Sequence, residues 1–224
     1  SADQGLVINP SNDKPTINLS NFKHKERQGE TKFYKKWFEK NGYKVEALPK
    51  EIKFEGGGEL LPWKGKFFIG QGFRNSSKAS KYIHEKFGVE FIPLTLINEK
   101  YYHLDTCMFI LNPNTIFYYP EAFDGKSIEI IKKSFENIVE FSENEVESFA
   151  ANSVVSGRNV FMQTGSKKFK ETVESFGYTA FEVDISEFMK SGGGIHCLTF
   201  ELQRLPHLEV MERVRVKEVR GGEG

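Results

Sequence analysis

The sequence has few cysteines and lacks any long apolar segment. Its two cysteines, Cys107 and Cys197, could form at most one bridge, which excludes a fold held together by a disulfide framework. The longest apolar runs, such as residues 106–111, are far shorter than a membrane span, and the first residues carry no basic segment followed by an apolar one. These absences predict a soluble, cytoplasmic protein that does not associate with membranes.

Net charge is absent as well. Lys and Arg total 31 and are balanced by 31 Asp and Glu, with no run of like charge, so no nucleic-acid partner is expected. No CxxC, HExxH or clustered His and Cys spacing is present, and the glycines at 56–58 lack the surroundings of a phosphate-binding loop. The sequence therefore predicts no metal and no cofactor, and favours a small-molecule substrate.

The sequence does contain a repeat. An apolar strand, a turn, a second strand, an amphipathic helix and a third strand recur four times. In that order, the expected elements are 6–8, 16–19, 30–40 and 43–48; then 58–61, 67–70, 77–87 and 89–96; then 108–111, 116–119, 127–136 and 138–141; and finally 153–156, 160–163, 166–176 and 178–183.

Local signals support these boundaries. A glycine follows three of the helices, where a left-handed C-terminal cap favours a residue without Cβ: Gly42, Gly88 and Gly177. A serine stands where a helix N-cap is expected in three units: Ser77, Ser127 and Ser166. Units of this kind can form a radial array with the helices outside, so the junctions between units, at 2–5, 54–59, 103–106 and 192–199, are where functional groups would converge.

Those junctions carry the motifs of a known family. FEGGGELL at 54–61, HLDT at 103–106 and GGGIHCLT at 192–199 resemble the guanidine-modifying enzymes, which include arginine and agmatine deiminases, dimethylarginine dimethylaminohydrolases and amidinotransferases. The resemblance covers residues 2–202. It implies an α/β fold of the pentein type, a propeller of ββαβ units around a central active site. The prediction is a single catalytic domain over residues 1–224 whose first ββαβ unit is missing or truncated.

The resemblance also assigns roles. Cys197 would attack the guanidinium carbon to give a covalent thiouronium, and His103 would protonate the leaving amine and then activate water. Glu55 would pair with this histidine, while Asp3 and Asp105 would clamp the guanidinium nitrogens. The chemistry is consistent, because a planar and permanently charged guanidinium is best held by flanking carboxylates.

The substrate prediction depends on three residues. Asp105 matches the form of the motif found in deiminases and amidinotransferases, which favours an unmethylated guanidinium. Arg27 and Arg74 stand where dimethylarginine hydrolases place arginines that contact the substrate's α-carboxylate, which favours arginine over agmatine. The alternative is that both arginines are solvated surface residues.

Other residues near the motifs receive lesser assignments. Cys107 precedes an apolar run and is expected in the core. His196 would point to the opposite face of a strand from Cys197 and is left out of catalysis. Glu59 is a candidate for supporting the catalytic residues, and Asn152 is interpreted as a turn residue that opens the fourth unit.

The leading prediction is a hydrolase, similar to arginine deiminase or dihydrolase, that converts a guanidino compound to a ureido compound with loss of ammonia. Two alternative functions remain open. An amidinotransferase would use the same side chains but pass the amidino group to an amine, and a ribosome-binding pentein would have no catalysis at all. The joint presence of Cys197, His103 and Glu55 favours an enzyme over the second alternative. An N-terminal segment or a second subunit, as in a homodimer, would be needed to complete the ring, because the sequence after Leu202 contains at most one more strand.

Overall fold

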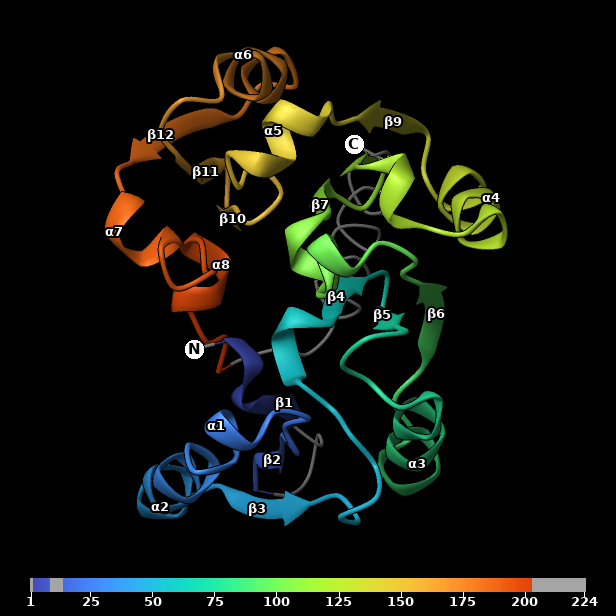
Figure 1. Cartoon of the computed structure of the whole chain (residues 1–224), viewed down its shortest axis with the longest axis vertical. Helices are drawn as coiled ribbons and strands as arrows, with labels where there is room; N and C mark the ends of the chain where they lie inside the picture. The colour runs from blue at the N-terminus through green and yellow to red at the C-terminus, as the bar shows by residue number, and fades with distance from the viewer. Residues whose placement is uncertain (1, 9–13, 203–224) are drawn as a thin grey trace, which may run out of the picture.

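The computed structural model describes residues 2–8 and 14–202, so the strand expected after Leu202 lies outside the described residues. Four three-stranded mixed sheets, each combined with helices, form an α/β fold. The sheets follow one another in chain order around a common centre, and the long helices lie at the rim (Figure 1).

Each unit contains two adjacent strands, a helix and a third strand. The units are β1 (Gly5–Ile8), β2 (Thr16–Leu19), α2 (Thr31–Lys40) and β3 (Lys44–Ala47); β4 (Leu60–Trp63), β5 (Lys66–Gln71), α3 (Ser77–Phe87) and β6 (Phe91–Thr95); β7 (Met108–Asn112), β8 (Thr115–Tyr118), α4 (Gly125–Ser134) and β9 (Asn137–Glu140); and β10 (Val154–Ser156), β11 (Asn159–Gln163), α6 (Lys167–Ser175) and β12 (Thr179–Val183). Four shorter helices are α1 (Lys25–Gln28), α5 (Glu143–Glu147), α7 (Ser186–Met189) and α8 (Ile195–Leu198).

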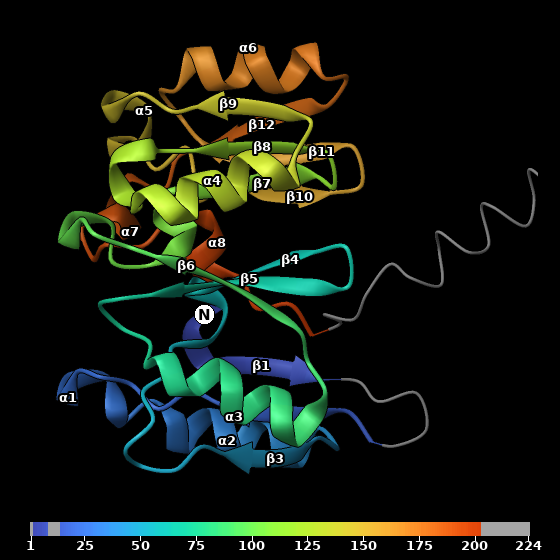
Figure 2. The same ribbon diagram turned by 90° about the vertical axis from the view of Figure 1, so that its right-hand side faces the viewer.

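The same topology recurs in every sheet. The first two strands are antiparallel, as in the pair β4 and β5. The third strand is parallel to the second, as in β5 and β6, and a parallel neighbour requires the crossover that the helix supplies. Seen from the side, most strands lie nearly along one common axis. The hairpin turns of the last three units lie at the same end of that axis (Figure 2).

The sixteen predicted elements are confirmed to within a few residues, but two N-caps are wrong. Ser76, not Ser77, caps α3 by accepting a hydrogen bond from the Lys78 amide at 3.2 Å. Asp124 caps α4 and accepts from the amide of Ser127, which itself lies inside the helix. Both errors come from helices that begin earlier than the apolar pattern indicates, because the first turn need not carry a buried residue.

The junctions before the inner strands pack tightly at the centre. One-turn 3-10 helices precede β1, β4 and β7: Ala2–Gln4, Gly56–Gly58 and Leu104–Thr106. A Cβ on Gly57 would lie 2.6 Å from the Ala2 carbonyl oxygen, and Gly56 adopts a φ of +44°. The glycines at 56–58 therefore serve close backbone packing.

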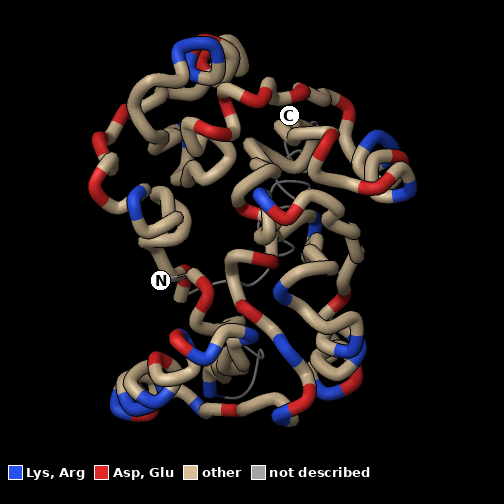
Figure 3. Tube along the Cα trace, in the orientation of Figure 1, with Lys and Arg blue, Asp and Glu red and all other residues tan. Residues whose placement is uncertain are grey.

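The largest hydrophobic cluster extends from the second unit through the third to the fourth. Phe117 of β8 and Phe169 of α6 meet with ring centroids 5.1 Å apart and are both fully buried. On the outer surface, the long helices at the rim, α2, α3, α4 and α6, each carry both basic and acidic residues (Figure 3). The apolar side of each helix thus holds the units together, and the centre is left for polar groups.

Candidate active site

Cys197 lies in a turn of helix, α8, and not in the strand that the sequence analysis expected. Gly192, with a φ of +78°, reverses the chain before it. Two hydrogen bonds close the turn: the His196 amide donates to the Asn152 carbonyl at 3.0 Å, and the Cys197 amide donates to Asn152 Oδ1 at 3.1 Å. Both acceptors belong to Asn152, which lies 45 residues before Cys197 in the chain. The local pattern of apolar residues therefore could not reveal these bonds.

The exclusion of His196 rested on the strand and is wrong in its geometry. Successive residues of a helix are about 100° apart, so neighbours can face the same centre. His196 is buried, and its Nδ1 lies 2.8 Å from Asp105 Oδ2. Burial would raise the pKa of the Asp105 carboxyl, but the hydrogen bond and charge of His196 hold it below its usual range.

The Cys197 sulfur has two polar neighbours. Its Sγ lies 3.3 Å from Asp105 Oδ2 and 3.2 Å from Asn152 Nδ2. Burial, together with the negative charges of Asp105 and Asp3, raises the pKa of the Cys197 thiol well above its usual range. In the unliganded protein, Cys197 is therefore a thiol that donates to Asp105.

His103 and Glu55 form a buried ion pair. His103 Nε2 lies 2.8 Å from Glu55 Oε2, and the Lys23 amide donates to Glu55 Oε1 at 3.0 Å. Burial would lower the pKa of His103, but the charge of Asp3 and the hydrogen bond with Glu55 raise it to about 9. Burial would raise the pKa of Glu55, but His103 lowers it to about 2. His103 is thus an imidazolium at neutral pH.

Asp3 and Asp105 are both buried, and each keeps one oxygen without a protein partner. Asp3 Oδ1 faces His103 Nδ1 at 3.9 Å, too far for a hydrogen bond. Within the described residues, neither Asp3 Oδ1 nor Asp105 Oδ1 has a hydrogen-bond partner. Buried carboxylate oxygens are normally satisfied, so a bound donor is expected to complete them.

The two arginines are not solvated surface residues. Arg27 Nη1 lies 2.7 Å from Asp3 Oδ2, and the side chain is also paired with Glu30. Arg74 Nη1 lies 3.1 Å from Glu55 Oε2, and its guanidinium stacks 4.2 Å over the ring of Tyr102. Each arginine therefore contacts a carboxylate of the site, and contact with a substrate carboxylate stays a prediction.

Glu59 is fully buried behind His103. A side chain on Gly70 would collide with its carboxyl group, and the Leu104 backbone lies on the other side. Burial raises the pKa of Glu59 to about 8, although the charge of His103 opposes the shift. Glu59 is therefore a neutral carboxylic acid at neutral pH.

We expect Glu59→Gln to keep turnover within about threefold of the parent, because the amide replaces a group that is already uncharged. Since the folded-state pKa of this acid is raised, the parent loses stability as pH rises from about 4.5 through about 8. The variant escapes that loss and should melt at least about 3 °C above the parent near pH 9. Melting curves across this range measure the difference, and parallel curves would show that Glu59 is ionised throughout.

Sequence reasoning missed Asn152, Tyr102 and His196. Asn152 is 1% exposed and contacts the Cys197 sulfur, yet it was interpreted as a turn residue. A signal was available, because Asn152 stands just before β10 as Asp3 stands before β1 and Asp105 before β7. Cys107, in contrast, is fully buried in the core as predicted, and burial raises its pKa well above the usual range.

The described residues contain neither a candidate membrane span nor a metal-binding cluster. No helix within 2–8 and 14–202 is long and apolar enough to cross a membrane. Over the same residues, no group of three or more His, Cys, Asp or Glu side chains is arranged to hold a metal ion.

Repeated strand-strand-helix-strand units around a buried centre of cysteine, histidine and carboxylates define the class of protein: an α/β protein of the pentein type. The family model for eukaryotic N,N-dimethylarginine dimethylhydrolase matches residues 8–204. The chain belongs to this family, in the branch of the pentein superfamily that also contains the arginine dihydrolases.

Named relatives support the same placement. The chain is 37% identical over 220 residues to the bifunctional arginine dihydrolase/ornithine cyclodeaminase AgrE of a Nostoc species, with 96% of this chain and 31% of AgrE covered. It is 30% identical to the dimethylarginine dimethylaminohydrolase of Mycobacterium tuberculosis, with 82% and 60% covered. The chain therefore spans about a third of AgrE and less than two thirds of the second relative.

A solved structure agrees with the fold. The N-terminal domain of ArgZ, an arginine dihydrolase from cyanobacteria, was solved as a variant covalently bound to a reaction intermediate. It superimposes on this chain with a TM-score of 0.85 at 36% identity. The match covers 92% of this chain and 76% of that domain.

Proposed function

We propose that this chain hydrolyses a C–N bond of a guanidino compound, with Cys197 as the nucleophile. The observation that carries the proposal is the pair of unsatisfied buried oxygens, Asp3 Oδ1 and Asp105 Oδ1, beside the Cys197 sulfur and the His103 imidazolium. A guanidinium supplies N–H donors and a positive charge, which are what both oxygens lack. The names of the relatives describe hydrolases of arginine and of dimethylarginine, which supports the same chemistry.

The bound cation would also activate the thiol. The pKa of Cys197 is raised by burial and by Asp105 and Asp3, so a positive charge between these groups lowers the cost of forming the thiolate. The thiol proton then leaves to water, and the sulfur attacks the guanidinium carbon. The nucleophile is therefore generated only when substrate is present.

The remaining steps need a proton donor and then a base. The carbon–sulfur bond forms, the carbon–nitrogen bond breaks, and the His103 imidazolium gives its proton to the departing amine. Neutral His103 next takes a proton from water, whose oxygen attacks the thiouronium carbon. The carbon–sulfur bond breaks, the proton of the new hydroxyl passes to the departing sulfur, and a neutral ureido product and the Cys197 thiol result. Glu55 holds the imidazole ring throughout, through the 2.8 Å contact.

Within this chemistry, we propose arginine as the substrate. Arg27 and Arg74 would exchange part of their contact with Asp3 and Glu55 for the substrate's α-carboxylate. We expect kcat/KM for arginine to exceed that for agmatine by at least about 100-fold, because agmatine lacks the α-carboxylate that both arginines would hold by charge-assisted hydrogen bonds. Assays of ammonia release from arginine, agmatine and dimethylarginine test the ranking, and equal rates with agmatine would contradict it.

The same assay separates the alternatives. Addition of glycine to the arginine reaction should leave ammonia release unchanged in a hydrolase. An amidinotransferase would instead form ornithine at a rate that depends on glycine. A binding protein without catalysis would release no ammonia in either case, and that result would sink the proposed function.

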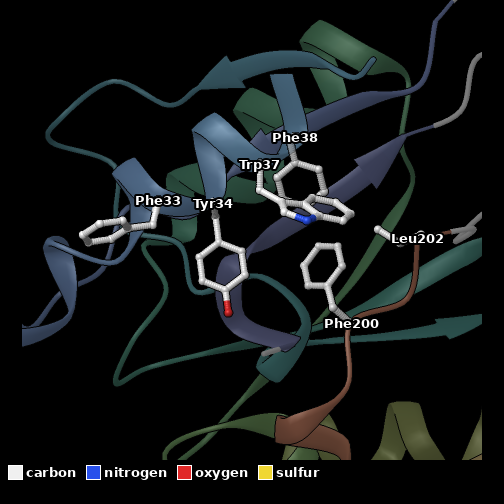
Figure 4. Close-up of a pocket in the computed structure, with 6 residues that line it drawn as sticks. All are labelled: Phe33, Tyr34, Trp37, Phe38, Phe200 and Leu202. Carbon is white, nitrogen blue, oxygen red and sulfur yellow. The ribbon is translucent and has the colours of Figure 1, made fainter. Parts of the chain in front are cut away.

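Two apolar faces remain uncovered on either side of α8. On α2, Phe33 and Trp37 are 64% and 46% exposed, and they line a groove of about 440 Å³ with Tyr34, Phe38, Phe200 and Leu202 (Figure 4). At the end of the fourth unit, Phe181 and Phe188 are 44% and 55% exposed. Exposed apolar surface of this extent marks an interaction site in most proteins.

We propose that a fifth strand-strand-helix-strand unit covers both faces in the active protein. Its support is the ArgZ domain, a quarter of which lies outside the match to this chain. We expect the 224-residue chain alone to turn over less than about a tenth as fast as a complete ring, because substrate would stay open to water. Light scattering with an arginine assay tests this. A fully active monomer of 25.7 kDa would contradict the proposal, and an active dimer would show that a second copy covers the faces.

A further inference from the structure

The side chain of Asn152 makes hydrogen bonds to both the main chain and the sulfur of the candidate nucleophile. Its Oδ1 accepts from the Cys197 amide at 3.1 Å, and its Nδ2 donates to the Asp105 carbonyl at 3.1 Å and to Cys197 Sγ at 3.2 Å. Its own carbonyl accepts from the His196 amide at 3.0 Å. Both N–H donors of this buried amide and one lone pair of its oxygen are therefore used, by Cys197 and Asp105.

The orientation of the amide follows from its partners. The Cys197 main-chain N–H can only donate, so it must meet the carbonyl oxygen of the Asn152 side chain. The Asp105 carbonyl can only accept, so it must meet the amide nitrogen. The second N–H therefore faces the sulfur, and exchanging the oxygen and nitrogen would break both main-chain bonds.

The loop before Cys197 is shaped to admit this side chain. A Cβ on Gly194 would lie 2.5 Å from Asn152 Oδ1 and 2.8 Å from its Cβ. Gly194, the last glycine of residues 192–194, therefore has to lack a side chain because Asn152 occupies that space. This contact is a second and independent observation of how closely the amide is packed. Because the partners of Asn152 are main-chain groups of the α8 turn, its position is tied to that of the sulfur.

We propose that Asn152 is a catalytic residue that holds Cys197 in place and donates a hydrogen bond to its sulfur when the sulfur is a thiolate. The proposal rests on Cys197 being the nucleophile of the proposed function. An N–H directed at sulfur does little for a thiol, which is a weak acceptor, but bonds strongly to an anion. The group therefore acts on the charged state, and the fold provides it before substrate arrives.

The test is the reactivity of the thiol itself, which needs no substrate. In a Cys107→Ser background, the rate of Cys197 alkylation by iodoacetamide is measured against pH for the parent, Asn152→Ala and Asn152→Asp. Because the pKa of the unliganded thiol is well above its usual range, the rate should rise about tenfold per pH unit over the accessible range. We expect Asn152→Ala to slow alkylation about tenfold at each pH, which corresponds to a rise of about one unit in the pKa of the thiol. Asn152→Asp keeps the shape but places a negative charge beside the sulfur, so its rate should be lower still.

Asn21→Ala serves as the structural control. Asn21 also binds main-chain carbonyls, those of Lys50 and Ile52 at 2.9 and 2.8 Å, but it does not touch the sulfur. Its variant should lose melting temperature and keep the alkylation rate of the parent at each pH. If Asn152→Ala does not fold, the isosteric Asn152→Asp variant decides.

Unchanged alkylation rates in folded Asn152 variants would overturn the inference and leave Asn152 with a structural role. Lowered rates in a protein that hydrolyses no guanidino compound would support the role of Asn152 and overturn the proposed function. In an active protein, we expect kcat for arginine to fall about tenfold with KM nearly unchanged, since the amide acts on the sulfur and not on the substrate.

Discussion

Replacing Cys197 with serine should lower kcat for the guanidino substrate by at least about 10⁴-fold, the largest loss of any single change in this chain. A serine hydroxyl does not ionise near neutral pH. Its pKa lies so far above that of a thiol that the positive charge of the substrate cannot lower it enough to form the anion. The fold should persist, because Cys197 is only partly buried and the α8 turn is held by its main-chain amide. Initial rates and circular dichroism on the same preparation measure both expectations.

Binding should survive the change. Asp3 and Asp105 keep their free oxygens in the variant, so the dissociation constant for arginine by calorimetry should stay within about tenfold of the parent KM. Cys107→Ser is the matched control, since Cys107 is fully buried and its variant should lose only stability, about 1–3 kcal/mol. Full activity in the Cys197 variant, or loss only in the Cys107 variant, would contradict the assignment of the nucleophile.

Much of the fold could be predicted from the sequence because its signals are local. Helices such as α3 carry an apolar stripe and end at a glycine, Gly88, whose φ of +69° confirms the left-handed cap. The same local pattern occurs in four units, which supports the assignment of each one. The radial arrangement of the units predicted that the junctions between them converge at the centre. Glu55, His103 and Cys197 stood out because the reactive residue types fell at equivalent places.

The rest depended on contacts between distant segments. The apolar residues Ile195, Leu198 and Phe200 suggested a strand. The segment instead forms a turn of helix, in which the Cys197 amide donates to Asn152. The same tertiary contact brings His196 to Asp105, 91 residues earlier in the chain. Local pattern has no information on such pairs, so tertiary structure overrode the prediction.

The centre is also organised by charge in a way that composition hides. Lys and Arg balance Asp and Glu over the chain, yet Asp3, Glu55 and Asp105 converge within reach of one histidine. Their negative charge raises the pKa of His103 against the effect of burial, and burial together with Asp105 and Asp3 raises the pKa of Cys197. His103 therefore stays a charged proton donor and Cys197 a neutral thiol. A cationic substrate is what this field favours, and the order of steps follows from it.

Replacing His103 with asparagine should lower kcat for arginine by about 10³- to 10⁴-fold, because the variant can neither protonate the departing amine nor activate water. The parent should keep its activity from neutral pH up to about pH 9, where the imidazolium loses its proton, and decline above it. This pH dependence should vanish in the residual rate of the variant. Rate profiles from neutral to alkaline pH compare the two proteins.

A substrate that needs no acid separates the two roles of His103. S-methylthiocitrulline would lose methanethiolate, a far better leaving group than an amine, and would give the same thiouronium on Cys197 as arginine. With no base to activate water, His103→Asn should accumulate this adduct, visible as an increase in intact mass that Cys197→Ser does not show. His84→Asn is the control, since His84 is exposed on α3 and binds the Val89 carbonyl at 3.0 Å. If the His103 variant turned over arginine at the parent rate, or formed no adduct while the parent did, another group would have to supply the proton and the base.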